Sequence, residues 1–318
     1  MTTTINKEQK NPNVPNLRFP EFEGEWQEKR LSDIADFSKG IGISKDQLSA
    51  DGEPCILYGE LYTKYKSETI KEVISKTNID NTKLVKSKAN DVIIPCSGET
   101  AEEIATARCV LKDDILLGGD LNIIRLHGYD GSFMSYQLNG KRKYDIAKVA
   151  QGVSVVHLYG EHLKNIKTIN PSLNEQKKIA NLLSLLDERI STQNKIIEKL
   201  ESLIKGIRND VFGKLRKSVG FNAMISDVLS YEQPQSYLVE DTEYTNEGTP
   251  VLTANKAFIL GYTSEIEGIY DKGDCIIFDD FTLDCKYVDF SFKVKSSAIK
   301  ILTAKNKELL RYTFEFLK

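Results

Sequence analysis

The sequence predicts an α+β protein in which two similar mixed α/β domains are connected by a long helix of the coiled-coil type. Two observations lead to this prediction. Apolar residues recur with a coiled-coil period over residues 172–212, and four short stretches before this segment are matched, in the same order, by stretches after it. We therefore expect a first domain over residues 1–170, a connecting helix over 171–213 and a second domain over 214–318.

The connecting helix carries an apolar stripe whose positions follow one another in steps of four and three, with only Gln193 polar. A stripe of this length is typical of a coiled coil rather than of an ordinary surface helix. Three further apolar residues widen it beyond what two helices bury, so we expect a docking surface for a partner; the alternative is a helix lying on its own domain. The predicted docking residues are Leu182, Leu183, Leu186, Ile190, Ile196, Ile197, Leu200, Leu203 and Ile204.

Both ends of this helix are marked in the sequence. Ser172 and Glu175 follow Pro171 with the S-x-x-E spacing of a capping box. Gly213 comes after the last apolar position of the stripe, and glycine readily adopts the left-handed conformation of a helix C-cap. We therefore expect the helix to begin at residue 172 and to end near Gly213.

The elements of the first domain follow from local patterns. Residues 1–16 are polar and are expected to form a flexible arm, followed by a loop with Phe19, Phe22 and Trp26. Apolar runs between glycine and Asp/Asn residues predict strands, and two more short strands are expected before the long helix. We predict a short helix over 27–36, strands over 55–62, 91–97, 114–119 and 122–128, and a helix over 132–148.

The second domain is predicted from the internal repeat, because each match is weak alone but all four keep their order. The matched stretches are 31–37 with 225–231, 52–61 with 248–257, 89–100 with 272–283, and 133–139 with 309–316. No counterpart of residues 150–212 follows the second copy in this sequence. If the chain is naturally truncated there, we expect its long helix to pair with that of a second copy; otherwise the sequence is a fragment of a longer chain.

The composition is typical of a globular protein that stays in the cytoplasm. The chain has 40% hydrophobic residues, no apolar segment of the length that a membrane span needs, and no signal peptide at its start. The five cysteines show no C-x-x-C spacing and are expected to be reduced and buried. The formal net charge is −3, but lysine and arginine gather in 64–88, 141–148 and 205–217. Such clusters can contact phosphates; the alternative is that each is an ordinary solvated face.

The sequence contains no catalytic motif that we can support. It has no phosphate-binding loop, no H-E-x-x-H and no G-x-S-x-G. His157 and His162 are five residues apart and therefore do not share one helical face as metal ligands would. Asp284 and Lys286 leave a metal-dependent nuclease as a weak alternative. We expect a protein without cofactor, metal or catalytic activity of its own.

Two stretches resemble a known family. Residues 17–40, LRFPEFEGEWQEKRLSDIADFSKG, resemble the N-terminal opening of the specificity subunits of bacterial type I restriction-modification enzymes. The segment PSLNEQKKIANLLSLLDERISTQNKIIEKLESL from Pro171 resembles the central conserved helix of that family, and the two-copy plan is similar as well. The second half would then be a truncated form, because its own conserved helix is missing.

This resemblance implies a function. Each domain would be a target-recognition domain that reads one half of a split site in double-stranded DNA. The helix would set the spacing of the half-sites and dock methyltransferase subunits, and restriction (translocase/nuclease) subunits would join the complex. The competing class is a coiled-coil scaffold or adaptor without DNA specificity.

The candidate DNA contacts lie in predicted loops. In the first domain, a loop over 96–108 follows a strand, and a glycine-containing loop lies between two lysines. Hydroxyl, amide and cationic side chains bind phosphates and base edges, with Asn suited to adenine and Lys to guanine. The predicted DNA-binding residues are Lys39, Lys45, Ser97, Thr100 and Arg108 in the first domain and Asn255, Lys256 and Lys286 in the second.

Overall fold

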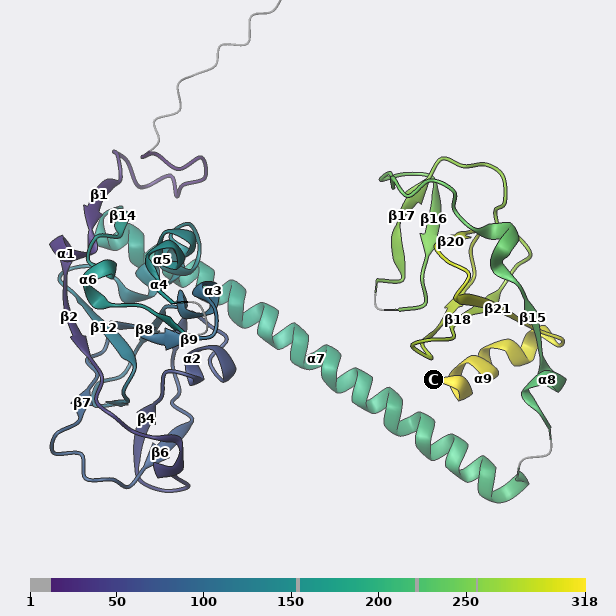
Figure 1. Cartoon of the computed structure of the whole chain (residues 1–318), viewed down its shortest axis with the longest axis horizontal. Helices are drawn as coiled ribbons and strands as arrows, with labels where there is room; N and C mark the ends of the chain where they lie inside the picture. Colours follow the sequence, from purple (N-terminus) through teal and green to yellow (C-terminus); the bar gives the residue numbers. More distant parts are fainter. Residues whose placement is uncertain (1–12, 153–154, 221–222, 256) are drawn as a thin grey trace, which may run out of the picture. The chain divides into compact units, whose positions relative to one another are not determined.

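The computed structural model describes residues 13–152, 155–220, 223–255 and 257–318 (Figure 1). The chain divides into two compact units, Met1–Asn194 and Lys195–Lys318. The boundary falls within the long helix α7 (Leu173–Val219), so each unit contains one part of this helix.

The first unit is built on a five-stranded sheet. Its order is β2 (Ala35–Lys39), β12 (Leu121–Leu126), β8 (Asp91–Pro95), β10 (Arg108–Val110) and β5 (Thr69–Ile70). The first four strands are antiparallel, and β5 runs parallel to β10. Val92 and Ile94 face one core and Ile93 the other, so β8 is a continuous apolar run because both sides of the sheet are covered.

A second five-stranded sheet completes this unit. Its order is β3 (Leu48–Ser49), β6 (Ser75–Thr77), β4 (Glu53–Ile56), β11 (Leu116–Leu117) and β7 (Val85–Lys86). Strand β6 is antiparallel to β4, whereas β11 is parallel to it. Short helices lie between the strands: η1 (Lys45–Gln47), α2 (Glu60–Thr63) and α3 (Ala101–Ile104).

Two sequence-based predictions about helices in this unit are wrong. The segment expected as a helix over 27–36 forms β1 (Gln27–Arg30), the single turn α1 (Leu31–Ile34) and the start of β2, because β1 pairs with β14 (Lys167–Asn170) before the long helix. The helix expected over 132–148 is divided at Gly140 into α4 (Gly131–Asn139) and α5 (Lys143–Val149). The remaining elements are β9 (Ser97–Gly98), β13 (Val156–His157) and α6 (Gly160–Leu163).

The second unit repeats this plan with fewer strands. Its main sheet has the order β15 (Leu229–Glu232), β21 (Ile299–Ala304), β18 (Cys275–Asp279) and β19 (Cys285–Val288). A smaller sheet has the order β17 (Ile259–Thr263), β16 (Thr249–Leu252) and β20 (Lys293–Val294). The helical elements are α8 (Ile225–Val228), η2 (Pro234–Tyr237) and α9 (Lys307–Leu317).

The topology confirms the internal repeat. Strands β15-β21-β18-β19 have the order and antiparallel pairing of β2-β12-β8-β10. Likewise, β17-β16-β20 reproduces the antiparallel and parallel pairs of β6-β4-β11. Gly52 and Gly248, which align in the repeat, both have φ near +120° and precede equivalent strands.

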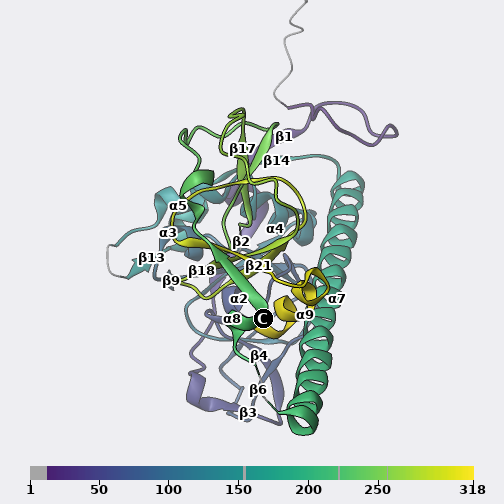
Figure 2. The ribbon, with the colours of Figure 1, turned by 90° about the vertical axis from the view of Figure 1, so that its right-hand side faces the viewer.

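Helix α7 starts as predicted and ends later than predicted. Ser172 Oγ accepts a hydrogen bond from Glu175 N (3.4 Å), which forms one half of the expected capping box. The helix continues through Gly213, so the prediction of a C-cap there is wrong. The left-handed glycine is Gly220 (φ +71°), whose N–H donates to Arg216 O. In the second unit, α9 lies alongside α7 (Figure 2) and an ion pair joins Arg208 to Glu315 (2.7 Å).

The cysteines confirm the sequence-based prediction. All five are free and buried, and burial raises the pKa of Cys55 and Cys96 to about 11. Within the described part of the chain, no helix is both long and apolar enough to cross a bilayer.

Candidate nucleic-acid interface and helix face

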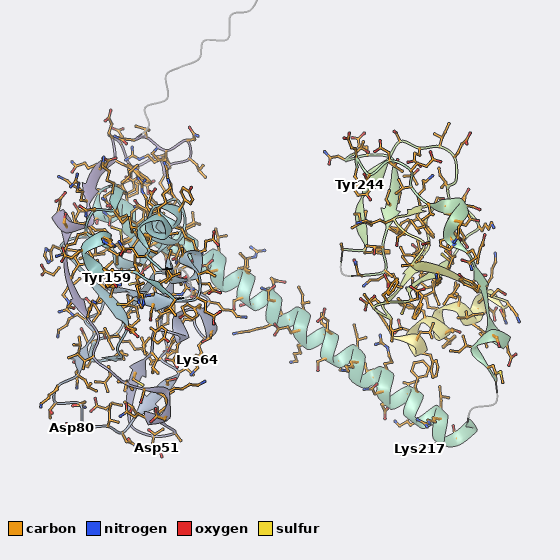
Figure 3. All side chains as sticks on the ribbon, in the orientation of Figure 1. Asp51, Lys64, Asp80, Tyr159, Lys217 and Tyr244 are labelled. Carbon is orange, nitrogen blue, oxygen red and sulfur yellow. The ribbon has the colours of Figure 1, made fainter. Side chains whose placement is uncertain are left out.

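Four basic and aromatic side chains meet at one end of the main sheet of the first unit. Lys39 Nζ lies 5.8 Å from the centre of the Tyr159 ring. His157 stacks on the same ring at 6.2 Å, and His162 meets it edge-on at 5.7 Å. We call these residues, Lys39, His157, Tyr159 and His162, the basic–aromatic cluster. Tyr159 is 45% exposed and is labelled in Figure 3.

The backbone around Tyr159 is held from two sides. The residues before it form β13, which pairs with β9 so that His157 lies opposite Ser97. Leu158 N donates to Cys96 O (2.8 Å). The buried Asn122 side chain donates from Nδ2 to Leu158 O (2.9 Å). The ring of Tyr159 is therefore presented to solvent from a fixed backbone.

The position of Lys39 also depends on Asn122. This lysine is the last residue of β2 and lies directly opposite Asn122 of β12. Asn122 thus joins the strand that carries Lys39 to the segment that carries Tyr159. An exposed cation beside an exposed phenol provides a charge for a phosphate and a hydroxyl for a base edge or a sugar.

A second cation directly follows helix α6. Lys164 Nζ is 5.9 Å from the centre of the Phe37 ring and pairs with Glu161 at 2.6 Å. Because this charge is compensated by a carboxylate, Lys39 is the better candidate for a phosphate contact.

Arg108 differs most from its prediction. It lies in β10, is buried, and donates from Nε to Tyr65 O and from an Nη to Ala107 O, both at 3.1 Å. Burial lowers the pKa of this guanidinium. The sequence placed Arg108 at the end of a loop, but that segment contains β9 and α3, and Arg108 itself begins β10. Its burial argues against a DNA contact, and we give Arg108 a role in holding the fold.

The other predicted residues of the first unit are accessible but scattered. Ser97 is half-buried in β9, next to the basic–aromatic cluster. Thr100 is exposed and caps α3, since its hydroxyl accepts a hydrogen bond from Glu103 N (3.2 Å). Lys45 is exposed at the start of η1. Ser97 therefore lies opposite His157 of the cluster that also contains Lys39, and DNA contacts by all four residues stay predictions.

In the second unit, two of the three predicted residues can be described. Asn255 is exposed and its Oδ1 accepts a hydrogen bond from Ala257 N (3.2 Å). Lys286 lies half-buried in β19. Lys256 lies outside the described residues. In the same unit, the side chains of Phe281 and Leu283 in the turn from β18 to β19 are 85% and 69% exposed, and no sequence pattern indicated this pair.

The predicted docking residues lie on α7. Eight of them, all except Leu183, are exposed, for example Ile190 at 59% and Leu203 at 56%. Near its start, α7 is fixed to the first unit. The Tyr136 hydroxyl donates to Asp187 Oδ2 at 2.5 Å, and an ion pair joins Lys71 to Glu188. Further along, the helix keeps an apolar face that its own chain leaves open to solvent over the described residues.

The start of α7 is anchored more strongly than its middle. Glu175 is buried, and its two carboxylate oxygens accept hydrogen bonds from Nε and an Nη of Arg18, both at 2.8 Å. The Trp26 indole N–H donates to the same carboxylate at 3.3 Å, and the Trp26 ring meets Phe133 of α4 edge-on. The aromatic loop expected from the sequence thus holds the helix to its unit.

Comparison with known proteins shows the family. The model of the type I restriction modification DNA specificity domain matches residues 23–202, and the chain belongs to this family. The sequence is 52% identical over 98 residues to the EcoR124I/EcoR124II specificity subunit of Escherichia coli, a match that covers 29% of this chain and 24% of that protein. It is 29% identical over 209 residues to the MjaVIII specificity subunit of Methanocaldococcus jannaschii, covering 65% and 46%.

These matches span less than half of the length of either curated relative. Among solved structures, the S subunit of a type I restriction-modification system from M. genitalium is similar with a TM-score of 0.67 and 17% identity. That similarity covers 92% of this chain and 76% of the other. It supports the two-domain fold with a long helix.

The basic–aromatic cluster contains residues that sequence patterns missed. The two histidines were considered only as metal ligands, and the search for groups of His, Cys, Asp and Glu that could hold a metal found none among the described residues. The two histidines lie close together because each packs against the Tyr159 ring. Neither a helical spacing nor a metal-ligand spacing in the sequence indicates such packing. The signal present in the sequence was an aromatic residue between two histidines, directly after a strand.

Proposed function

We propose that this chain is the DNA sequence-recognition subunit of a type I restriction-modification complex. The observation that carries the proposal is the match of the specificity-domain family to residues 23–202, which include the basic–aromatic cluster and the first part of α7. Each unit reads one half of a split target in double-stranded DNA. The repeated sheet topology supports this assignment, because one recognition scaffold occurs twice.

The first unit contacts DNA through the basic–aromatic cluster. Lys39 binds a phosphate, and Tyr159 places its hydroxyl at the adjoining sugar or base edge. Phosphate contacts fix the position of a protein on DNA, whereas base-edge contacts distinguish sequences. His157 and His162 hold the Tyr159 ring, so that a hydrogen bond from its hydroxyl forms with little loss of side-chain freedom.

The exposed face of α7 docks methyltransferase subunits, which supply the adenine-methylating chemistry. Restriction subunits with translocase and nuclease activity join this core, and the recognition subunit itself is non-catalytic and cytoplasmic. No cofactor is needed for recognition.

The test uses the full chain assembled with the methyltransferase subunit of its system. We expect Lys39→Gln to weaken binding to all DNA sequences alike and to reduce the slope of log affinity against log salt by about one, because one phosphate contact is lost. Fluorescence anisotropy with labelled duplexes at several salt concentrations measures both quantities.

The matched control is Lys167→Gln. Lys167 is also exposed but pairs with Glu28 at 2.7 Å in the separate β1–β14 pair, so its loss should leave the slope unchanged. If the unaltered complex shows no sequence preference, the chain is a scaffold of the coiled-coil class instead. An unchanged slope for Lys39→Gln would remove this residue from the interface.

A further inference from the structure

The turn between β18 and β19 of the second unit presents two large apolar side chains to solvent. Phe281 and Leu283 are both largely exposed on this short connection, which runs from Asp279 to Cys285. Two such side chains on one turn form a patch, and apolar patches with polar residues around them commonly mark interaction sites. We call Phe281 and Leu283 the apolar tip.

The backbone of this turn is held by its own hydrogen bonds. The buried Asp279 accepts hydrogen bonds at Oδ1 from Phe281 N (2.9 Å) and Thr282 N (3.0 Å). Asp279 N donates to Asp284 O, and Leu283 N donates to Asp279 O, both at 2.9 Å. Leu283 lies in the left-handed region (φ +60°), which is strained for a residue with a side chain. The turn thus holds the apolar tip on a fixed backbone.

The main sheets of the two units can be aligned residue by residue. Strands β2 and β15 each begin directly after a four-residue helix, α1 and α8. Strand pairing then aligns Phe37, Ile124 and Val92 of the first unit with Tyr231, Leu302 and Ile276 of the second. The side chains agree with this alignment, because Val92 and Ile276 both face the core that the following helix covers, α4 or α9.

The alignment places the apolar tip at the end of the sheet that corresponds to the basic–aromatic cluster. Five residues beyond Val92 lies Ser97, which is opposite His157 of that cluster. Five residues beyond Ile276 lies Phe281. Phe281 therefore takes the place of Ser97, and an aromatic ring stands where the first unit has a hydroxyl.

Carboxylates lie on both sides of the apolar tip. Asp280 and the exposed Asp284 flank it in the sequence, and Asp280 pairs with Lys300 at 3.1 Å. Because carboxylates repel phosphates, this turn is suited to the base edges within a groove and not to the DNA backbone. The apolar group that a base edge offers in the major groove is the C5-methyl group of thymine.

We propose that the apolar tip reads a thymine in the half-site of the second unit, with Phe281 against its C5-methyl group. The proposal rests on the proposed function and adds a specificity-determining contact to it. A phenyl ring on a fixed backbone makes this contact with little loss of side-chain freedom. The two units then use the same place in one scaffold to read different chemical groups.

The experiment uses the full chain assembled with the methyltransferase subunit of its system, and duplexes with the sequence that this complex methylates. Each thymine of that sequence is replaced in turn by deoxyuridine, which lacks only the C5-methyl group. We expect one replacement to weaken binding about fourfold, the effect of burying one methyl group. The Phe281→Ala complex should bind the thymine and deoxyuridine duplexes equally at that position. Fluorescence anisotropy at constant salt measures both affinities.

Ile266→Ala is the matched control. Ile266 is 88% exposed, against 85% for Phe281, and lies between Glu265 and Glu267. It follows β17 of the smaller sheet and is therefore not part of the apolar tip. This variant should keep the fourfold preference for thymine. Circular dichroism of both variants establishes that the fold is kept.

The outcomes separate this inference from the proposed function. If the unaltered complex binds all DNA sequences equally, the proposed function fails. If it prefers its target but no deoxyuridine replacement weakens binding, or if Phe281→Ala keeps the preference for thymine, the thymine contact is wrong. If Phe281→Ala instead reduces the amount of methyltransferase subunit that co-purifies with the chain, the apolar tip contacts a protein and the proposal is overturned.

Discussion

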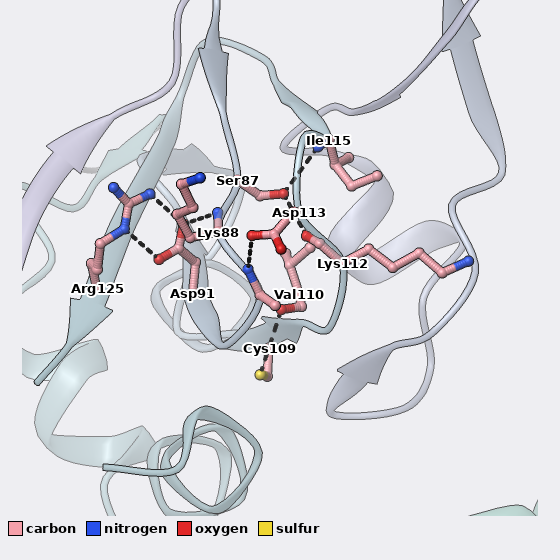
Figure 4. A network of polar contacts seen from close by, with 10 residues as sticks. Ser87, Lys88, Asp91, Cys109, Val110, Lys112, Asp113, Ile115 and Arg125 are labelled. Carbon is pink, nitrogen blue, oxygen red and sulfur yellow. Dashed lines mark hydrogen bonds and ion pairs between the residues drawn. The ribbon is translucent and has the colours of Figure 1, made fainter. Parts of the chain in front are cut away.

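At the scale of residues, the fold of the first unit depends on a buried carboxylate. Asp91, at the start of β8, accepts hydrogen bonds from Nε and an Nη of Arg125 at 2.8 and 2.7 Å and from Lys88 N at 2.8 Å (Figure 4). These hydrogen bonds raise the pKa of Arg125. Ser87 nearby accepts from Ile115 N and donates to Lys112 O. The network fixes the end of the sheet at which β8 starts and the antiparallel β12 ends.

We expect Asp91→Asn to lower the free energy of unfolding of the first unit by about 2 kcal/mol, because hydrogen bonds from a guanidinium and an amide to a buried carboxylate are lost. Urea unfolding followed by circular dichroism measures the change. The control is Glu72→Gln. Its ion pair with Lys112 is exposed, so the effect should stay within about 0.5 kcal/mol. Equal effects of the two substitutions would contradict this role of Asp91.

Some candidate site residues could be predicted from their residue type alone. Whether the others are exposed near the cluster or buried depends on three-dimensional packing. Lys39 and Ser97 were predicted as DNA contacts, and Ser97 lies opposite His157 of the cluster that contains Lys39. Arg108 has suitable chemistry but is buried, which a position in the chain does not reveal because β10 begins inside the predicted loop. Tyr159 was missed because its surroundings come from β2, β9 and β12, segments far apart in the sequence.

At the scale of elements, α7 was predicted best, because a stripe of apolar residues over many turns has few other interpretations. Its end was placed too early, since Gly213 lies inside α7. Nothing lies within 4 Å of the position that its Cβ would take, so no neighbouring atom requires a glycine there. The residue at which a helix ends depends on the local geometry of its last turn more than on the period of its apolar residues. The division of α4 from α5 at Gly140 was missed for the same reason.

The exposed face of α7 leads to a prediction for Ile197, which is 52% exposed. A carboxylate in the centre of an apolar interface is desolvated without a partner, so we expect Ile197→Asp to weaken binding of the methyltransferase subunit at least about a hundredfold, the tail of hot-spot effects. Co-purification and calorimetry measure this loss.

Lys199→Asp provides the comparison. Lys199 is exposed on the same helix, two residues further and so about 200° around it. The same acid there should change binding little. A comparable loss for both variants would mean that general charge on α7, and not its apolar face, governs docking.

At the scale of the whole molecule, the repeat was predictable in outline and not in detail. Four matched stretches indicated two similar domains, and the strands β2-β12-β8-β10 and β15-β21-β18-β19 confirm the correspondence. The smaller sheet of the second unit and the exposed turn at Phe281 were not predicted. Strand pairing joins residues far apart in the chain, and short apolar runs carry little information about their partners.

Two similar units lead us to expect independent reading of two half-sites. Tyr159→Ala in the first unit should relax base preference in one half of the methylated sequence, and Asn255→Ala in the second unit should relax it in the other half. Loss of a good base contact typically costs about 1–3 kcal/mol of discrimination. Sequencing of methylated adenines in cells that express each variant measures this. A change in both halves from either substitution would contradict independent reading.

The anchoring of α7 has one practical consequence. Trp26 is the only tryptophan of the chain; its indole donates to Glu175 and its ring lines a cavity beside Leu183. The tryptophan fluorescence of the protein therefore comes from a single, half-buried indole at the anchored start of α7. Detachment of the helix from its unit would expose that indole to water and shift its emission to longer wavelength, so the unlabelled protein reports whether α7 is anchored.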